Sequence, residues 1–457
     1  MNKVIIDFDP SDLKSIERRV LKVLNEANFT PKSTPGCPLD NLFRTDAEVF
    51  AKANRHIITG LVLDRMVKLS DITLEELKMM TPRELVDNNY IDPIKLSVKN
   101  EPNKIKKLKE GRQRIICMQS VVNQFCERMI YDEMLSSQIQ NWKKHCKKVG
   151  MGFNKEQVSD FLATLRFRLG ERIISDDIQA YDWSRQEWIR FCDRILLHIV
   201  IQGPKSLHDL IDKFEHLMGV QVFTTSDGKL FMLHQPNGSI WSIQISGRLR
   251  TIDENSNARI IVSNAFSMSH GISKPVSIAM GDDNTSQLPG PPNDEDAVAE
   301  YIRWYDEIGW TVTDALVSRW GSDAEFSFCS HRYKMKDGSC VLESWPKALH
   351  QFMNKNPVDI DLVDRYLQSE ELVSNLTPTF PESSVRSMIA WAGWNPPNNS
   401  YIPQCGIMKS IKDTKQMNAA KERSKDSKPA PMKLPPLKRK EAHKEVKHIV
   451  ERKSETH

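Results

Sequence analysis

Two groups of aspartates are the residues of this 457-residue chain whose types and spacing could do chemistry. Asp177 is followed five positions later by Asp182, and Asp282-Asp283 comes directly after Gly281. Carboxylate oxygens are ligands that Mg²⁺ prefers, and adjacent aspartates in a turn repel each other unless a cation lies between them. Gly281 allows a backbone conformation that a side chain would oppose. The pattern therefore predicts a divalent-cation site.

A third element lies between the two acidic groups. Ser246-Gly247-x-x-x-Thr251-x-x-x-Asn255 is predicted to end a β-rich run and to begin a helix. Thr251 and Asn255 are four positions apart and so share one helix face, where a hydroxyl and an amide could bind one ligand. A ribose with its 2′-hydroxyl would fit. Together the three elements indicate in-line attack at phosphorus, with two cations clamping the attacking and leaving oxygens.

The surrounding pattern predicts the elements that position these residues. Apolar periodicity indicates helices over 11–27, most of 44–88, 118–137, 156–170, 184–201, 248–268, from 294 onward and over 346–395. Short apolar strands are expected at 173–175 and 276–280, each leading into aspartates. Strand-like runs with hairpin turns are expected over 220–245 and 326–343. This mixture predicts an α+β fold with the carboxylates at strand ends.

Charge is unevenly distributed along the chain. The stretch 95–114 holds eight Lys and Arg residues, and 409–457 holds 15 Lys and Arg against 7 Asp and Glu, although the whole chain carries only +4. A solvated charged face would explain the first stretch, but a basic tail also predicts contact with an anionic partner such as RNA or a membrane surface. The sequence shows no signal peptide at its N-terminus and no apolar stretch near 18 residues.

The order of the three elements resembles palm motifs A, B and C of the RNA-dependent RNA polymerases of positive-strand RNA viruses. The stretch 177–184, DIQAYDWS, is similar to the form in sobemovirus, polerovirus and barnavirus polymerases. The stretch 328–331 resembles their motif E, 99–114 their motif F, and 33–39 their fingers motif near the template channel. The resemblance covers roughly residues 30–335.

This resemblance implies a right-hand α+β polymerase fold of fingers, palm with an antiparallel sheet, and helical thumb. The expected divisions are fingers 1–170 with a phosphate-binding motif at 95–118, palm motif A at 171–190, a return to the fingers at 191–240, palm motifs B to E at 241–335, thumb 336–408, and a basic, disordered tail 409–457.

The resemblance also implies roles for individual residues. Asp177 and Asp282 would bind two Mg²⁺ or Mn²⁺ ions, assisted more weakly by Asp283. The ribose and its 2′-hydroxyl would be read by Asp182 and Asn255, with Ser246, Gly247 and Thr251 nearby. The triphosphate would be neutralised by Lys99, Arg112 and Arg114.

The partners implied are RNA template and product and ribonucleoside triphosphates. A genome-linked protein primer is a further candidate, as is a membrane surface bound through the basic tail. The expected location is the host cytoplasm, including membrane-associated replication sites.

The sequence departs from the family at motif D and leaves two other functions open. Tyr305, Gly309 and Trp310 match the start of motif D, but the stretch 310–314 supplies no lysine. Arg319 is a weak candidate because arginine as a residue type is a poor proton donor, so the general acid is unassigned. A reverse transcriptase is one alternative, although it would carry an aromatic residue where this chain has Met280. The other is a nonenzymatic RNA-binding protein with structural aspartates.

Overall fold

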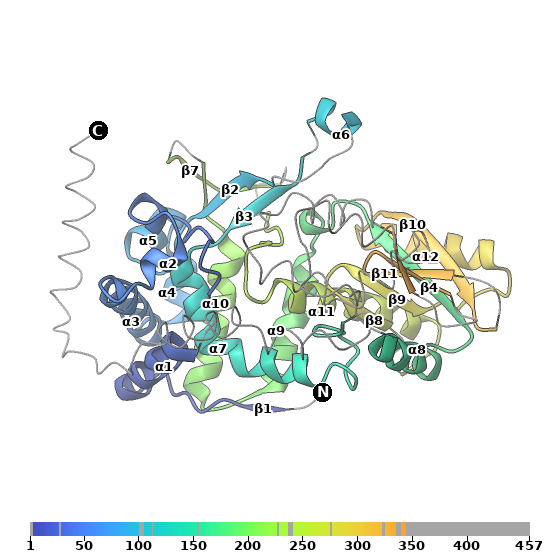
Figure 1. Ribbon diagram of the computed structural model, residues 1–457, viewed down its shortest axis with the longest axis horizontal. Coiled ribbons are helices and arrows are strands. Elements are labelled where there is room, and N and C mark those ends of the chain that lie inside the picture. The colour runs from blue at the N-terminus through green and yellow to red at the C-terminus, as the bar shows by residue number, and fades with distance from the viewer. Residues whose placement is uncertain are drawn as a thin grey trace, which may run out of the picture. The chain divides into compact units, whose positions relative to one another are not determined.

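The computed structural model describes residues 3–26, 29–99, 105–111, 113–152, 155–225, 228–235, 241–274, 277–321, 325–334 and 340–343. The described chain divides into two compact units. Unit 1 takes the described residues within 1–137 and 182–251, and unit 2 takes those within 138–181 and from 252 onward. Apart from 340–343, the predicted thumb and tail lie outside the described residues. The predicted α+β class is confirmed, because both units combine helices with β-sheet (Figure 1).

Unit 1 is mainly helical. Its elements are β1 Val4–Ile5, α1 Leu13–Glu26, η1 Leu39–Asn41, α2 Asp46–Val49, α3 Arg55–Asp71, α4 Leu74–Met79, α5 Pro82–Asp87, β2 Ile94–Val98, α6 Ile105–Lys109, β3 Ile115–Met118, α7 Val121–Gln140, η2 Tyr181–Trp183, α9 Glu187–Val200, β5 Ile201–Gln202, α10 Lys205–Val220, β6 Phe223–Thr224 and β7 Leu230–Phe231; α7 and η2 cross the unit boundaries. The strands form a four-stranded sheet, β3-β2-β6-β7, and the parallel pair β1-β5.

The core of unit 1 lies between its long helices. Val20 of α1, Val62 of α3 and Phe214 of α10 belong to one buried cluster, which matches the apolar spacing of these segments. Two short helices begin at Thr-x-x-Glu sequences, and both form full capping boxes. In each, the threonine hydroxyl accepts the backbone N–H of the glutamate, and the glutamate carboxylate accepts the backbone N–H of the threonine. Local sequence therefore determines where these two helices start. For the long helices, apolar spacing determines which face packs into the core.

Unit 2 is built on an antiparallel sheet. Its elements are α8 Lys155–Leu169, β4 Arg172–Ile178, α11 Thr251–Ser269, β8 Ser277–Met280, β9 Asp283–Gln287, α12 Asp294–Glu307, β10 Val312–Arg319, β11 Glu325–Phe328, β12 His331–Lys334 and β13 Cys340–Leu342, with α11 beginning at the unit boundary. The four-stranded sheet has the order β10-β4-β9-β8, and β11-β12-β13 form a second, three-stranded sheet.

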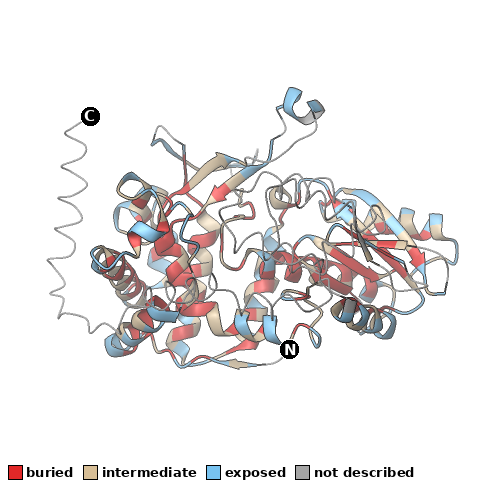
Figure 2. Ribbon diagram, in the orientation of Figure 1, coloured by how far each residue is buried: buried red, intermediate tan, exposed pale blue. Residues whose placement is uncertain are grey.

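The two faces of the four-stranded sheet are covered by different elements. On one face Ile173 and Ile278 pack with Phe161 of α8 and with Phe326 and Phe328 of β11. On the other face Asp176 meets the side chain of Arg259 from α11. Figure 2 shows that the central strands of this sheet are mostly buried. Because side chains alternate across a strand, the residues on either side of Asp176 point away from α11.

The described elements differ from the predicted ones in several places. Among the described residues between 220 and 245, the predicted strand-like run contains the two-residue strands β6 and β7, and neither helix α10 nor strand β10 was predicted. In the predicted hairpin at 326–343 the first turn falls at Cys329 and Ser330, whose φ angles are +53° and +58°, and β12 and β13 flank the predicted turn at 337–338. Within the described part of the chain, no helix has the combined length and hydropathy needed to span a bilayer.

Candidate active site

The carboxylates of Asp177, Asp282 and Asp283 gather at one end of the four-stranded sheet. In the antiparallel pair β4-β9, Asp176 lies opposite Asn284. One step further along, Asp177 near the end of β4 and Asp283 at the start of β9 lie at the same end of the sheet. Asp282 lies in the turn between β8 and β9, and both it and Asp177 are exposed. Residues more than 100 positions apart in sequence are thus brought together by strand pairing.

Gly281 shapes the turn that carries Asp282. Its φ is +68°, the left-handed region that glycine occupies without strain. Its backbone N–H donates to Ser256 Oγ at 2.9 Å, which ties the turn to the first half of α11. The conformational reason for a glycine here was predicted from the sequence, whereas the serine that holds it was not.

Mutual repulsion and burial act on two of these carboxylates. The pKa of Asp283 is raised from 3.8 to about 6, first by burial and then by the charge of Asp282, although the backbone N–H of Cys329 opposes the rise by donating to the carboxylate. The pKa of Asp177, an exposed residue that is still partly desolvated, is also raised, first by that desolvation and then by the charge of Asp282. Two carboxylates whose ionisation is opposed, beside the carboxylate of Asp282, form a site where a bound cation would be favourable.

The start of the Ser246–Asn255 motif has a clear structural role. Ser246 Oγ accepts the backbone N–H of Cys117 at 3.2 Å, which joins the motif to β3. A Cβ atom on Gly247 would lie 2.4 Å from the Cys117 carbonyl oxygen, so only glycine fits against this strand. Thr251 Oγ1 donates to the Ile245 and Arg248 carbonyls at 2.7 and 2.9 Å, which closes the turn that begins α11.

Asn255 is different because its side chain has spare hydrogen-bonding capacity. The residue is 6% exposed, and within the described part of the chain its Oδ1 atom has no hydrogen-bond partner. Its backbone carbonyl accepts the hydroxyl of Tyr181 at 3.0 Å, which anchors the helix to the end of the β4 segment. A buried amide oxygen without a partner costs free energy, so a ligand that donates to it would be favoured.

Asp182, Lys99 and Arg114 lie in unit 1. Arg114 Nη2 is 3.7 Å from Asp182 Oδ2, and both side chains are partly exposed. Lys99 extends the β2-β3 hairpin, with its backbone N–H donating to the Arg114 carbonyl at 2.8 Å. Arg112 lies outside the described residues.

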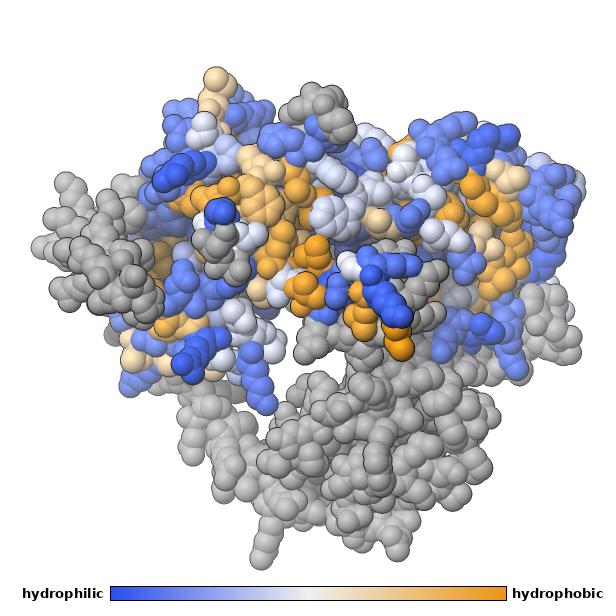
Figure 3. Space-filling view, turned by 90° about the horizontal axis from the view of Figure 1, so that it is seen from above, coloured by the Kyte–Doolittle hydropathy of each residue, from blue (hydrophilic) through white to orange (hydrophobic). Residues whose placement is uncertain are grey.

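The short helix α6 forms part of the connection between β2 and β3 (Figure 1). Exposed apolar residues occur along this hairpin, among them Val98, Ile105 and Ile115. Figure 3, which views the molecule from the side of this hairpin, shows hydrophobic residues interspersed with hydrophilic ones. Among its described residues the hairpin thus exposes both apolar side chains and basic ones such as Lys109 and Arg114.

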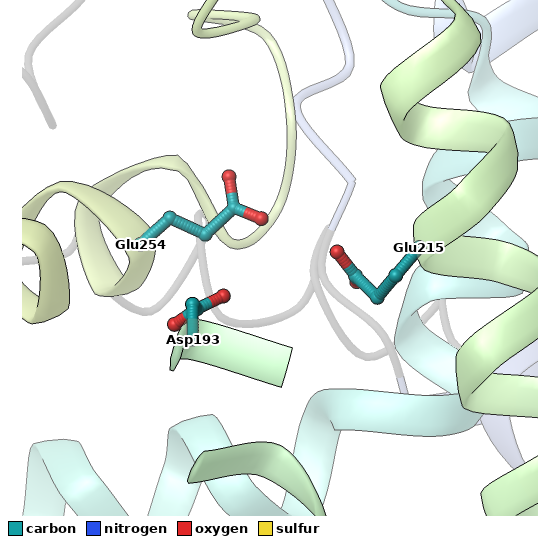
Figure 4. A group of neighbouring side chains, drawn as sticks. All are labelled: Asp193, Glu215 and Glu254. Carbon is teal, nitrogen blue, oxygen red and sulfur yellow. The ribbon is translucent and has the colours of Figure 1, made fainter. Parts of the chain in front are cut away.

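A second acidic group was not predicted from the sequence. Figure 4 shows the side chains of Asp193 and Glu215, which belong to unit 1, and also labels Glu254, which belongs to unit 2. Two of them already bind a cation within unit 1, because the guanidinium of Arg250 is 2.9 Å from Asp193 and 3.0 Å from Glu215. Arginine thus supplies the positive charge that these two carboxylates need, and we do not place the catalytic ions here.

No candidate for the general acid emerges among the described residues of motif D. Arg319, the weak candidate, forms an ion pair with Asp294 in which Nη2 and Oδ1 are 2.6 Å apart. Trp310 is fully buried and packs in the core of unit 2, 5.3 Å from the ring of Tyr181. Sequence reasoning also missed Asp176 and Arg259, which pair directly behind the Asp177 strand. The sequence did contain a signal for this pair, namely an acidic residue directly before Asp177 and a basic residue one helical turn after Asn255.

Comparison with known proteins finds similarity to one kind of protein. The profile described as viral RNA-directed RNA-polymerase matches residues 2–192. The chain is 29% identical over 360 residues to the replicase polyprotein P2AB of Southern bean mosaic virus, which covers 78% of this chain and 35% of that protein. It is 26% identical over 395 residues to the RNA-directed RNA polymerase of Mushroom bacilliform virus, covering 83% of this chain and 87% of that one.

A further viral protein is similar to the chain at about the same level of identity. Protein P1-P2 of Turnip yellows virus is 29% identical over 350 residues, which are 73% of this chain and 31% of that protein. The chain therefore spans about a third of the length of several of the replicase proteins that it matches. A solved structure, the insertion loop deletion mutant of the RNA-dependent RNA polymerase of a human picorbirnavirus, aligns with a TM-score of 0.48 at 14% identity over 72% of this chain and 64% of that one.

The resemblance to viral RNA-directed RNA polymerases that the motifs predicted is confirmed. The chain is similar to replicase and polymerase proteins of the sobemovirus, polerovirus and barnavirus group.

Proposed function

We propose that this chain is an RNA-directed RNA polymerase that replicates the genome of a positive-strand RNA virus by nucleotidyl transfer. The observation that carries the proposal is the meeting of Asp177, Asp282 and Asp283 at one end of the unit 2 sheet, in a chain related to viral polymerases. Phosphoryl transfer needs little covalent chemistry from the protein, so correct placement of such carboxylates is most of what the fold must provide.

The three carboxylates fit a pair of divalent cations, Mg²⁺ or Mn²⁺. Burial and the charge of Asp282 raise the pKa values of Asp177 and Asp283, and cations would relieve that repulsion. Asp177 and Asp282 would be the main ligands, with Asp283 assisting. When bound, the ions would stabilise charge on the attacking and leaving oxygens. Among the chain's own groups, the Cys329 N–H would keep the Asp283 carboxylate oriented through its hydrogen bond.

The ribose would be read by the end of motif A and by the motif B helix. The buried Asn255 Oδ1 atom, which lacks a partner among the described residues, is suited to accept a hydrogen bond from a 2′-hydroxyl. Asp182, Ser246, Gly247 and Thr251 complete the proposed set; Gly247 does so by allowing the close backbone approach and not by a side-chain contact. Lys99, Arg112 and Arg114 would neutralise the triphosphate.

The assignment of regions belongs to the same proposal. Fingers would come from 1–170 and 191–240, the palm from 171–190 and 241–335, and the thumb from 336–408. The β10-β4-β9-β8 sheet, which carries the carboxylates, supports placing the palm in this part of the chain.

The finer partners are also proposals. Besides RNA and ribonucleoside triphosphates, these are a genome-linked protein primer and a membrane surface in the host cytoplasm. The tail 409–457, whose charge is +8, would hold RNA or anionic lipid. Deleting it should weaken RNA binding and flatten the dependence of affinity on salt, because fewer counterions would be released. An unchanged affinity and salt slope would show that the tail does not bind RNA.

The decisive experiment measures labelled ribonucleotide incorporation on a primed RNA template with Mg²⁺ or Mn²⁺. Wild type is compared with Asp282→Ala and with Asp306→Ala, a control at an exposed aspartate of α12 in the same unit. We expect template-dependent synthesis that Asp282→Ala abolishes and Asp306→Ala leaves within about twofold of wild type.

The other outcomes separate the competing functions. Preference for deoxynucleotides would indicate a reverse transcriptase. RNA binding without any magnesium-dependent synthesis would favour the nonenzymatic binding protein. Equal incorporation by wild type and Asp282→Ala would point to a contaminating polymerase and would remove the assigned metal site.

A further inference from the structure

Arg259 is buried directly behind the strand that carries Asp177. Its guanidinium Nη2 is 2.5 Å from Asp176 Oδ1, and both side chains are 0% exposed. The same guanidinium lies over the rings of Tyr305 and Trp310, at 5.9 and 5.6 Å from their centroids. An ion pair excluded from water in this way joins α11 to β4 at the position next to Asp177.

The Arg259–Asp176 pair has features that do not favour the stability of the fold. Within the described part of the chain, Arg259 Nε and Nη1 and Asp176 Oδ2 have no hydrogen-bond partner. Taking two charges out of water costs several kcal/mol unless their remaining groups are satisfied, and apolar residues of similar size often stabilise a protein as well or better. A half-satisfied buried pair therefore suggests that its geometry serves another purpose.

The geometry links the two halves of the proposed site. Asn255 lies four residues before Arg259, one turn earlier on the same side of α11. Tyr181 donates to the Asn255 carbonyl at 3.0 Å, and its ring is 5.3 Å from that of Trp310, over which the Arg259 guanidinium lies. A closed chain of contacts therefore runs from the Asp177 strand through Arg259 and Trp310 back to Asn255.

We propose that Arg259 is a positioning residue that fixes the Asp177 carboxylate relative to Asn255 through its pair with Asp176. The inference rests on the proposed polymerase function and deepens it. Metal binding at Asp177 and ribose reading at Asn255 are then coupled by one buried guanidinium. Arginine suits this task better than lysine, because its planar fork can hold a carboxylate while stacking on aromatic rings.

The test uses Arg259→Lys, which keeps the charge and loses the fork, and Arg259→Met, which loses both. Arg65→Lys is the matched control, since Arg65 is equally buried and pairs with Asp92 at 2.7 Å in unit 1, outside the proposed site. Two quantities are measured for each protein in its folded form. One is the ratio of kcat/KM for ribonucleotides to that for 2′-deoxynucleotides, and the other is Mn²⁺ affinity by electron paramagnetic resonance without RNA.

A positioning role predicts that Arg259→Lys lowers the ribose preference about tenfold and weakens Mn²⁺ binding several-fold, with Arg65→Lys leaving both within twofold. A purely structural role would lower the folded fraction, which cancels in the kcat/KM ratio. Arg259→Lys with both quantities within twofold of wild type would overturn the proposal. Should Arg259→Met fail to fold, Arg259→Lys still decides. Should wild type synthesise nothing, the proposed function fails, while the Mn²⁺ comparison continues to test the positioning of Asp177.

Discussion

Replacing Asp283 by asparagine is expected to stabilise the metal-free protein at neutral pH. Asp283 is half-buried, and burial followed by the charge of Asp282 raises its pKa from 3.8 to about 6. Asparagine has nearly the same shape and can still accept the Cys329 N–H, but it does not ionise. The substitution therefore removes a charge that the folded, metal-free protein resists.

The size of the effect follows from the pKa difference. Because the folded-state pKa of Asp283 lies above its ordinary value of 3.8, the carboxyl contributes stability that is fully present below about pH 4 and is lost as the pH rises through about 6. A shift of about two pKa units corresponds to ~3 kcal/mol. Since the residue keeps some contact with solvent, we expect Asp283→Asn to gain about 1–3 kcal/mol over wild type above pH 6 and little near pH 4.

Urea denaturation at a series of pH values from 4 to 8, with a chelator present, measures this directly. Asp7→Asn, at an exposed position in unit 1, serves as the control and should show no pH-dependent gain. Adding Mg²⁺ should narrow the gap between wild type and Asp283→Asn, because the ion stabilises only the protein that binds it well. A free-energy difference that stays constant from pH 4 to 8 would refute the reasoning.

Three further substitutions test the packing within the two units. Arg65→Met should cost about 3–5 kcal/mol in urea unfolding because it leaves Asp92 buried without its 2.7 Å partner, whereas Arg83→Met, from an exposed pair, should cost under about 1 kcal/mol. Gly36→Ala should lower the melting temperature, since φ is +73° and a Cβ atom would lie 2.8 Å from neighbouring backbone atoms; an unchanged melting temperature would contradict this conformation. Phe161→Ala should destabilise unit 2 by about 3–5 kcal/mol in the same urea assay, because its ring is fully buried in the core under the sheet, and a loss below about 1 kcal/mol would argue against that core.

Local spacing was sufficient to predict the main features of the candidate site. A short apolar run ending in Asp177, a glycine before Asp282 and a helix beginning near Thr251 are all features of neighbouring residues. The observed strand β4, the +68° φ of Gly281 and helix α11 agree with them. The helix α10 was not predicted, and the strands expected over 220–245 are mostly absent from the described part of that region. In such segments tertiary packing outweighs the local preference for strand or helix.

The sequence by itself indicated the resemblance to viral RNA-directed RNA polymerases, the α+β class and the three candidate carboxylates, because motif order and strand-end spacing are properties of the linear chain. Only the tertiary structure showed that Asp176 pairs with Arg259, that Cys329 donates to Asp283, and that Gly247 passes against Cys117. Each of these contacts joins residues separated by dozens of positions or more, and depends on strand register and helix packing. Such contacts leave no periodic signal in the sequence, so the groups that hold the site in place were visible only once the chain was folded.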